Sequence, residues 1–182
     1  MERQKARKEK MTTLVTGATR GIGREAARQL AARGARVILA VRDAKKGQEV
    51  VDEILRECPD ADVILGPTLD LASCQSIRSF AKAYGPYPLH VLLNNAALGS
   101  NALKSLTPEG IVNLVQVNFL GPFLLTRLLE EKLKESAPSR VVNVSSISQY
   151  QKKKLIKKKK PFGGIYPFGE TSITDLRVIT WQ

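Results

Sequence analysis

Short apolar runs rich in β-branched residues alternate with segments of helical period along residues 11–149. Strands that alternate with helices of about 10 to 15 residues imply right-handed crossovers and a parallel sheet covered on both faces. The pattern therefore predicts a doubly wound α/β fold with five clear strands. The expected strands are residues 11–17, 35–41, 61–66, 89–96 and 139–146, and the expected helices are residues 22–34, 44–58, 72–84 and 108–134.

The composition fits one soluble domain. The 182 residues suffice for one sizeable core and are too few to assign a second. The chain is 43% hydrophobic and 25% charged, and no apolar run approaches the roughly 20 residues of a membrane span. Because the basic N-terminus also lacks the apolar stretch of a secretory signal, a cytoplasmic protein without a transmembrane anchor is expected.

The net charge of +12 is concentrated in two short segments. Residues 1–10 carry +3, and the seven lysines within residues 152–160 add +7, so the rest of the chain carries only +2. Charge placed in this way describes basic tails on a nearly neutral domain. A nucleic-acid partner is therefore not favoured, although binding of nucleic acid or of an anionic surface through the lysine run remains an alternative.

Metal and histidine chemistry have little support in the sequence. His90 is the only histidine, and Cys58 and Cys74 are the only cysteines, without the spacing of metal ligands. Neither a metal site nor a histidine-based catalytic triad is expected.

A glycine-rich turn marks the first strand end, where residues 16–23 read TGATRGIG. Ligands of doubly wound sheets bind at the carboxyl ends of the strands. Gly17, Gly21 and Gly23 would let the backbone turn sharply and approach a pyrophosphate, which backbone amides and the helix N-terminus then bind. The turn therefore predicts a dinucleotide site of the Rossmann-like kind, with a plain tight turn as the alternative.

Further motifs follow the later strands, in order and over about residues 11–149. Together they resemble the short-chain dehydrogenase/reductase family and, within it, the retinol-dehydrogenase-like branch. The motifs are TGATRGIG at 16–23, the pair Asp70 and Leu71, NNAA at 94–97 (with Ala97 in place of the family's glycine), Asn118 in the fourth helix, and NVSS at 143–146.

The resemblance implies an oxidoreductase that transfers hydride between a nicotinamide cofactor and a small carbonyl or alcohol substrate. It also implies a possible homodimer through the helix at 108–134. The expected cofactor-binding residues are Gly17, Arg20, Gly21, Ile22, Gly23, Arg42, Asp70, Leu71, Asn94 and Ala96, and the expected catalytic residues are Asn118, Ser146, Tyr150 and Lys154.

The form of the cofactor can be argued from charge. A carboxylate after the second strand suits the ribose 2′-hydroxyl of NAD, whereas the 2′-phosphate of NADP suits arginine. Arg20 in the glycine turn and Arg42 after the second strand favour NADP(H) over NAD(H), while Asp43 is a signal in the other direction.

The proposed acid-base pair leaves the question of activity open. Tyr150 and Lys154 have the Y-x-x-x-K spacing that places both side chains on one helix face. The family, however, places its tyrosine a dozen or more residues after the serine, and here only four positions separate Ser146 from Tyr150. A lysine run also creates such matches by chance. Tyr166 is better spaced, but Glu170 follows it where a lysine is needed.

The chain beyond Tyr150 does not resemble the continuation of the family. We therefore divide the sequence into a basic tail (1–10), an NADP-binding Rossmann-like domain (11–149) and a divergent lysine-rich tail (150–182), in which residues 173–181 could form one strand. The C-terminal strands of the family are expected to be missing or divergent, as in a truncated or frame-shifted product. A catalytically impaired nucleotide-binding protein, or an interaction protein, is the alternative to an active enzyme.

Overall fold

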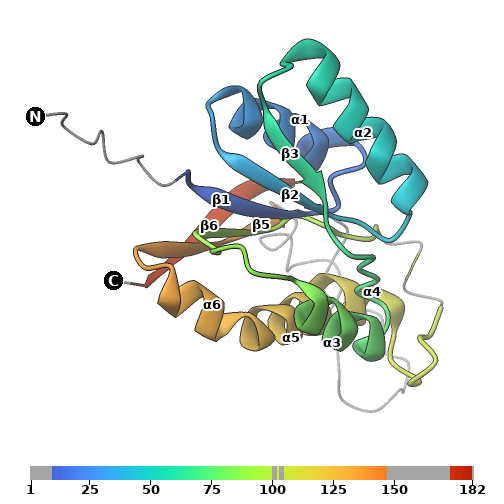
Figure 1. The fold of residues 1–182 in the computed structure, drawn as a ribbon. Helices are drawn as coiled ribbons and strands as arrows, with labels where there is room; N and C mark the ends of the chain where they lie inside the picture. The colour runs from blue at the N-terminus through green and yellow to red at the C-terminus, as the bar shows by residue number, and fades with distance from the viewer. Residues whose placement is uncertain (1–9, 100–101, 103–104, 147–172, 182) are drawn as a thin grey trace, which may run out of the picture.

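The computed structural model describes residues 10–99, 102, 105–146 and 173–181. Its six strands form one sheet in the order β3-β2-β1-β4-β5-β6 (Figure 1). Strands β1 to β5 are parallel to their neighbours, and β6 is antiparallel to β5. The doubly wound fold with five parallel strands is thus confirmed. The strands are β1 (Thr12–Thr16), β2 (Arg36–Ala40), β3 (Asp62–Leu65), β4 (Val91–Asn94), β5 (Ser139–Ser146) and β6 (Ile173–Trp181).

Helices cover both faces of the sheet (Figure 1). Two helices lie on one face, and the remaining helical segments lie on the other. The first group is α1 (Gly21–Ala32) and α2 (Ala44–Glu57), and the second is α3 (Cys74–Ala83), α4 (Asn113–Val115), the π-helix η2 (Gln116–Leu120), α5 (Gly121–Leu128) and α6 (Glu130–Glu135).

Neighbouring residues of each strand enter opposite cores, because side chains of a strand alternate between faces. Leu14 packs among the residues of the α3 and α5 side, while Val15 packs among those of the α1 and α2 side. Likewise, Ile38 packs on the α3 and α5 side, and Leu39 packs on the α1 and α2 side. Burial on both faces explains why the parallel strands read as continuous apolar runs in the sequence.

The prediction of one continuous helix at 108–134 is wrong in its start and its continuity. Residues before Asn113 form a turn instead, in which Gly110 has φ +78° and the Thr107 amide donates to the Ile111 carbonyl at 2.7 Å. Leu106 and Val112 close this turn as an antiparallel bridge. The helical segments that follow include a π turn, which an apolar period does not reveal.

Residues 173–181 form a strand, as the sequence allows. Strand β6 pairs with β5 along its length, from Ser139 opposite Trp181 to Ser146 opposite Ile173. A register shift occurs between Ser145 and Ser146. Strand β5 is therefore an inner strand, and part of the predicted divergent tail belongs to the sheet. Within the described ranges, no helix has the length and apolar character needed to cross a membrane.

We expect truncation of a core leucine to destabilise the fold strongly. Leu125 in α5 is fully buried, whereas Leu106 is 61% exposed. Leu125→Ala should lower the free energy of unfolding by about 2–5 kcal/mol, because it leaves a cavity in the core. The control Leu106→Ala should change it by about 0.5 kcal/mol or less. Urea unfolding followed by circular dichroism measures both, and equal losses would contradict the assignment of this core.

Candidate functional site

A cavity of about 800 Å³ opens at the carboxyl ends of the parallel strands. Strand β1 lies between β2 and β4, so the chain changes direction of winding at this point of the sheet. Open α/β sheets bind ligands at such a switch point. The walls come from the turn after β1, the start of α2 and the segments after β3 and β4. Asn113 in α4 and Val117 in η2 also line the cavity. The lining residues include Thr16, Gly17, Thr19, Arg20, Gly21, Ile22, Gly23, Val41, Arg42, Asp43, Lys46, Leu69, Asp70, Leu71, Ala72, Asn95, Ala96, Ala97, Leu98, Asn113 and Val117.

The glycine turn packs directly against the segment that follows β4. A Cβ atom on Gly17 would lie 2.7 Å from the Cα of Ala96. A Cβ atom on Gly23 would collide with the side-chain amide of Asn95 and lie 2.6 Å from the Gly17 carbonyl oxygen. Only glycine therefore fits at Gly17 and Gly23, which confines the turn to one wall of the cavity.

One hydroxyl fixes this contact. The Oγ1 of Thr16 accepts hydrogen bonds from the amides of Asn95 and Ala96, both at 3.0 Å, and donates to the Leu93 carbonyl at 3.3 Å. In return, the Nδ2 of Asn95 donates to the carbonyls of Thr16 at 3.0 Å and Gly17 at 3.3 Å. The ends of β1 and β4 are thus joined through side chains as well as through the sheet.

The N-terminus of α1 faces the cavity with its first turn. Arg20 is the N-cap residue, and its side chain makes no capping hydrogen bond. No acidic residue occupies the first turn, and Arg20, Gly21, Ile22 and Gly23 all line the cavity. A helix N-terminus with free amides is partly positive and binds anions. This corner of the cavity is therefore suited to phosphate.

Basic side chains lie beside that corner. Arg20, Arg42 and Lys46 all line the cavity and are exposed to solvent. Asp43 also lines it, but its Oδ1 accepts from the Lys46 amide at 3.1 Å as the N-cap of α2. Its Oδ2 lies 3.4 Å from the Nζ of Lys46. These interactions, led by the backbone hydrogen bond, lower the pKa of Asp43, so the carboxylate is ionised at neutral pH.

Asp70 belongs to the opposite wall and also orders its own loop. Its Oδ1 accepts from the Ala72 amide at 2.9 Å, and its amide donates to the Ser76 Oγ at 2.9 Å. The carboxylate therefore shapes the turn between β3 and α3 while it lines the cavity.

The predicted cofactor-binding residues all line the cavity except Asn94. Asn94 is only 6% exposed and lies beneath it. Its Nδ2 donates to the Oδ1 of Asn143 at 2.9 Å and to the Oγ1 of Thr126 at 3.3 Å. Asn94 therefore connects β4 to β5 and α5, while the next residue, Asn95, has the place in the cavity wall.

The π-helix η2 holds two of the cavity loops. Asn118 accepts from the Leu98 amide at 2.8 Å and donates to the Leu98 carbonyl at 2.9 Å. The fully buried Gln116 donates to the Leu71 carbonyl at 3.1 Å. Sequence reasoning missed Gln116, although it has the same signal as Asn118, a polar residue in an apolar helix.

The structure describes only one of the other predicted catalytic residues, and that one only through its backbone. Ser146 is the last residue of β5, at the same end of the sheet as the cavity. Its side chain, Tyr150 and Lys154 lie outside the described residues, so the catalytic pair stays a prediction.

Known proteins are similar to this chain in sequence and in fold. The model of the family described as short chain dehydrogenase matches residues 11–156. The chain belongs to this family. Human retinol dehydrogenase 11 is 50% identical over 139 residues, and human retinol dehydrogenase 12 is 46% identical over 139 residues. Each match covers 75% of this chain and 43% of the relative, so the chain spans less than half the length of these relatives. The resemblance to the retinol-dehydrogenase-like branch is confirmed.

Two solved structures are also similar to this chain in sequence and in fold. A metagenomic short-chain oxidoreductase in complex with NADP is 32% identical with a TM-score of 0.64, and the match covers 77% of this chain and 64% of that one. Actinorhodin polyketide ketoreductase with NADPH is 34% identical with a TM-score of 0.60, covering 75% of this chain and 53% of that one.

Addition of one methyl group at Gly23 should disturb the contact between the two loops. We expect Gly23→Ala to lower the free energy of unfolding by about 1–3 kcal/mol, because the new atom overlaps backbone and the Asn95 amide. The control is Gly99→Ala, since a Cβ at Gly99 meets nothing within 4 Å. Chemical denaturation of both variants tests this, and unchanged stability of Gly23→Ala would contradict the close packing.

Proposed function

We propose that this chain binds NADP(H) in the cavity and acts as an oxidoreductase, transferring hydride between NADP(H) and a carbonyl or alcohol substrate. The observation that carries the proposal is the joint placement of the uncapped α1 N-terminus and three basic side chains on one cavity. The names of the retinol dehydrogenase relatives support a lipophilic substrate. The NADP and NADPH complexes of the similar structures support the cofactor.

The residues present fit a dinucleotide. The cavity volume of about 800 Å³ lies within the roughly 300–1,000 Å³ of small-molecule sites. Space beside Gly21 is open, since a Cβ there would meet nothing within 4 Å. The glycine turn and α1 amides would hold the pyrophosphate, Arg20 and Arg42 the 2′-phosphate, and Asp70 with Leu71 the adenine side.

The chain's own residues would prepare the substrate for hydride transfer. The nicotinamide, when bound, supplies or accepts the hydride at the carbonyl carbon. Asn118 holds the Leu98 segment of the cavity wall through both of its amide atoms. By the family resemblance, Ser146 would orient the carbonyl oxygen and Tyr150 would exchange its proton, assisted by the Lys154 ammonium.

Titration with both cofactors tests the proposal. We expect NADPH to bind at least about tenfold more tightly than NADH, because Arg20 and Arg42 pair with the 2′-phosphate. Reduced-nicotinamide fluorescence gives both dissociation constants. Oxidation of NADPH by a lipophilic aldehyde such as retinaldehyde should follow.

Equal affinities, or tighter binding of NADH, would contradict the NADP assignment. Selective NADPH binding without aldehyde reduction would instead favour the nucleotide-binding alternative over the enzyme. Tyr150→Phe provides the matched test of catalysis, because it removes only the hydroxyl and should abolish turnover while cofactor binding persists.

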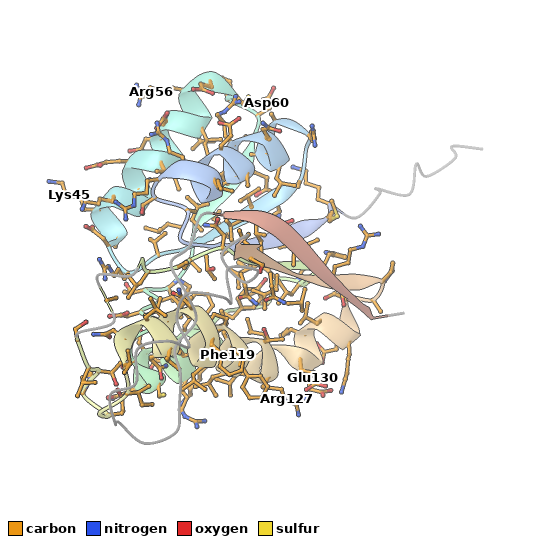
Figure 2. All side chains as sticks on the ribbon, turned by 180° about the vertical axis from the view of Figure 1, so that it is seen from behind. Lys45, Arg56, Asp60, Phe119, Arg127 and Glu130 are labelled. Carbon is orange, nitrogen blue, oxygen red and sulfur yellow. The ribbon has the colours of Figure 1, made fainter. Side chains whose placement is uncertain are left out.

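We also propose that two copies pair through the helix layer of η2 and α5. Phe119 and Phe123 are 55% and 61% exposed and lie four positions apart. Phe119 lies in the same layer as Arg127 and Glu130 (Figure 2). We expect light scattering with size-exclusion chromatography to give the mass of a dimer. The double variant Phe119→Asp and Phe123→Asp should give a monomer, and a monomeric unmodified chain would refute the pairing.

A further inference from the structure

A glutamine lies fully buried in the helix layer, behind the wall of the cavity. Gln116 in η2 is 0% exposed and is not among the residues that line the cavity. Its Nε2 donates to the Leu71 carbonyl at 3.1 Å and lies 3.8 Å from the Sγ of Cys74. Its Oε1 has no hydrogen-bond partner among the described residues. Gln116 therefore holds the loop after β3 with one half of its amide, while the other half stays unpaired.

The unpaired oxygen makes this residue an unfavourable choice for the fold alone. A buried amide gives up its hydrogen bonds with water, and each one that is not replaced lowers stability. Methionine has a similar length and would fill the same space without a polar atom that needs a partner. Methionine would leave the Leu71 carbonyl without its donor but would also remove the unpaired Oε1, so the two effects on stability oppose each other. What glutamine adds is the position of that carbonyl.

The wall segment at residues 69–72 has its other anchors elsewhere. The Leu69 amide donates to the Val41 carbonyl after β2 at 2.9 Å, and the Asp70 amide donates to a side-chain hydroxyl of α3 at 2.9 Å. Among the described residues, the Gln116 side chain supplies the hydrogen bond that joins this segment to η2. The distance between this wall and the helix layer therefore depends on Gln116.

Close packing of the helix backbone reinforces this contact. A Cβ atom on Gly121, the first residue of α5, would lie 2.8 Å from the Leu71 carbonyl oxygen and 2.9 Å from the backbone carbonyl oxygen of Gln116. The Leu71 carbonyl is thus bound by the Gln116 side chain and packed against the helix at Gly121. A change at either residue should displace it.

We propose that Gln116 is a positioning residue for the cofactor, which holds the Leu71 carbonyl, and with it the wall on the adenine side of the cavity, without contacting the cofactor itself. This inference rests on the proposed function, in which Asp70 and Leu71 face the adenine. Loss of the Gln116 amide should therefore weaken binding of the adenine half of the cofactor while the fold keeps its stability.

Four variants separate this role from general damage to the core. Gln116→Met removes the amide and nearly keeps the volume. Leu114→Met is its matched control, because Leu114 is buried in the adjoining α4 and does not line the cavity. Cys74→Ala removes the sulfur contact of Gln116 and keeps its bond to Leu71. Gly121→Ala displaces the Leu71 carbonyl while Gln116 stays in place.

The first measurement needs no cofactor. Hydrogen exchange of the free 182-residue chain, followed by mass spectrometry, compares residues 69–76 with residues 94–98. We expect Gln116→Met to speed exchange in residues 69–76 by about three- to tenfold, because one hydrogen bond less shifts the local opening equilibrium by that factor. Residues 94–98 are held by Thr16 and Asn118 and should exchange at an unchanged rate.

The second measurement gives the dissociation constants of NADPH and of adenosine 2′,5′-bisphosphate, which carries the adenine half without nicotinamide. We expect Gln116→Met and Gly121→Ala to weaken both by about three- to tenfold. Leu114→Met and Cys74→Ala should leave both constants within about twofold. The urea midpoint of Gln116→Met should stay close to that of the unmodified chain, which a merely structural role would not allow. If Gln116→Met does not unfold cooperatively, Gly121→Ala decides by the same criteria.

The failure of this inference differs from the failure of the proposed function. If the unmodified chain binds NADPH selectively but Gln116→Met binds both ligands equally well, the role of Gln116 is refuted and the NADP proposal stands. An equal loss of affinity in Leu114→Met or Cys74→Ala would also refute it, because the effect would not pass through Leu71. Lack of NADPH binding by the unmodified chain would refute the proposed function and, with it, a role of Gln116 in cofactor binding.

Discussion

The hydrogen bonds of the Thr16 hydroxyl are the constraint on which the cavity depends. This one group accepts from two amides after β4 and donates to a carbonyl of β4, so it joins the carboxyl ends of β1 and β4. The glycine turn packs against Asn95 and Ala96, so a Cβ atom at Gly17 or Gly23 would overlap these residues. The same corner holds Arg20 and the N-terminus of α1 at the wall of the cavity.

The cavity walls formed by the loops after β3 and β4 are held by hydrogen bonds from η2. Gln116 and Asn118 project from η2 and hydrogen-bond the backbone at Leu71 and Leu98. A π turn widens the helix by one residue, and such turns are frequent at functional sites. Here it lets one short segment hold the loops after β3 and β4. The loops after β3 and β4 and the predicted catalytic Asn118 are thereby coupled to the same piece of helix.

The sequence predicted the parallel strands well, because strands buried on both faces are continuous apolar runs bounded by polar ends. It predicted the glycine turn from the need to approach a pyrophosphate, whereas the structure requires glycine at Gly17 and Gly23 because a Cβ atom there would overlap Ala96, Asn95 or the Gly17 carbonyl. It could not separate Asn94 from Asn95, since adjacent strand residues point to opposite sides and a motif does not say which side faces the cavity. It also assigned residues 108–112 to a helix, because an apolar period contains no information about the turn at Gly110.

The sheet order has a consequence for synthesis on the ribosome. Strand β1 emerges before β4, yet it lies in the interior of the sheet, with Thr13 paired to Val91 on one side. Translation at about 5–20 residues per second leaves one edge of β1 unpartnered for roughly 4–16 seconds. The nascent chain therefore presents an apolar strand edge during that time, and a chaperone that covers it until β4 arrives would limit misassembly.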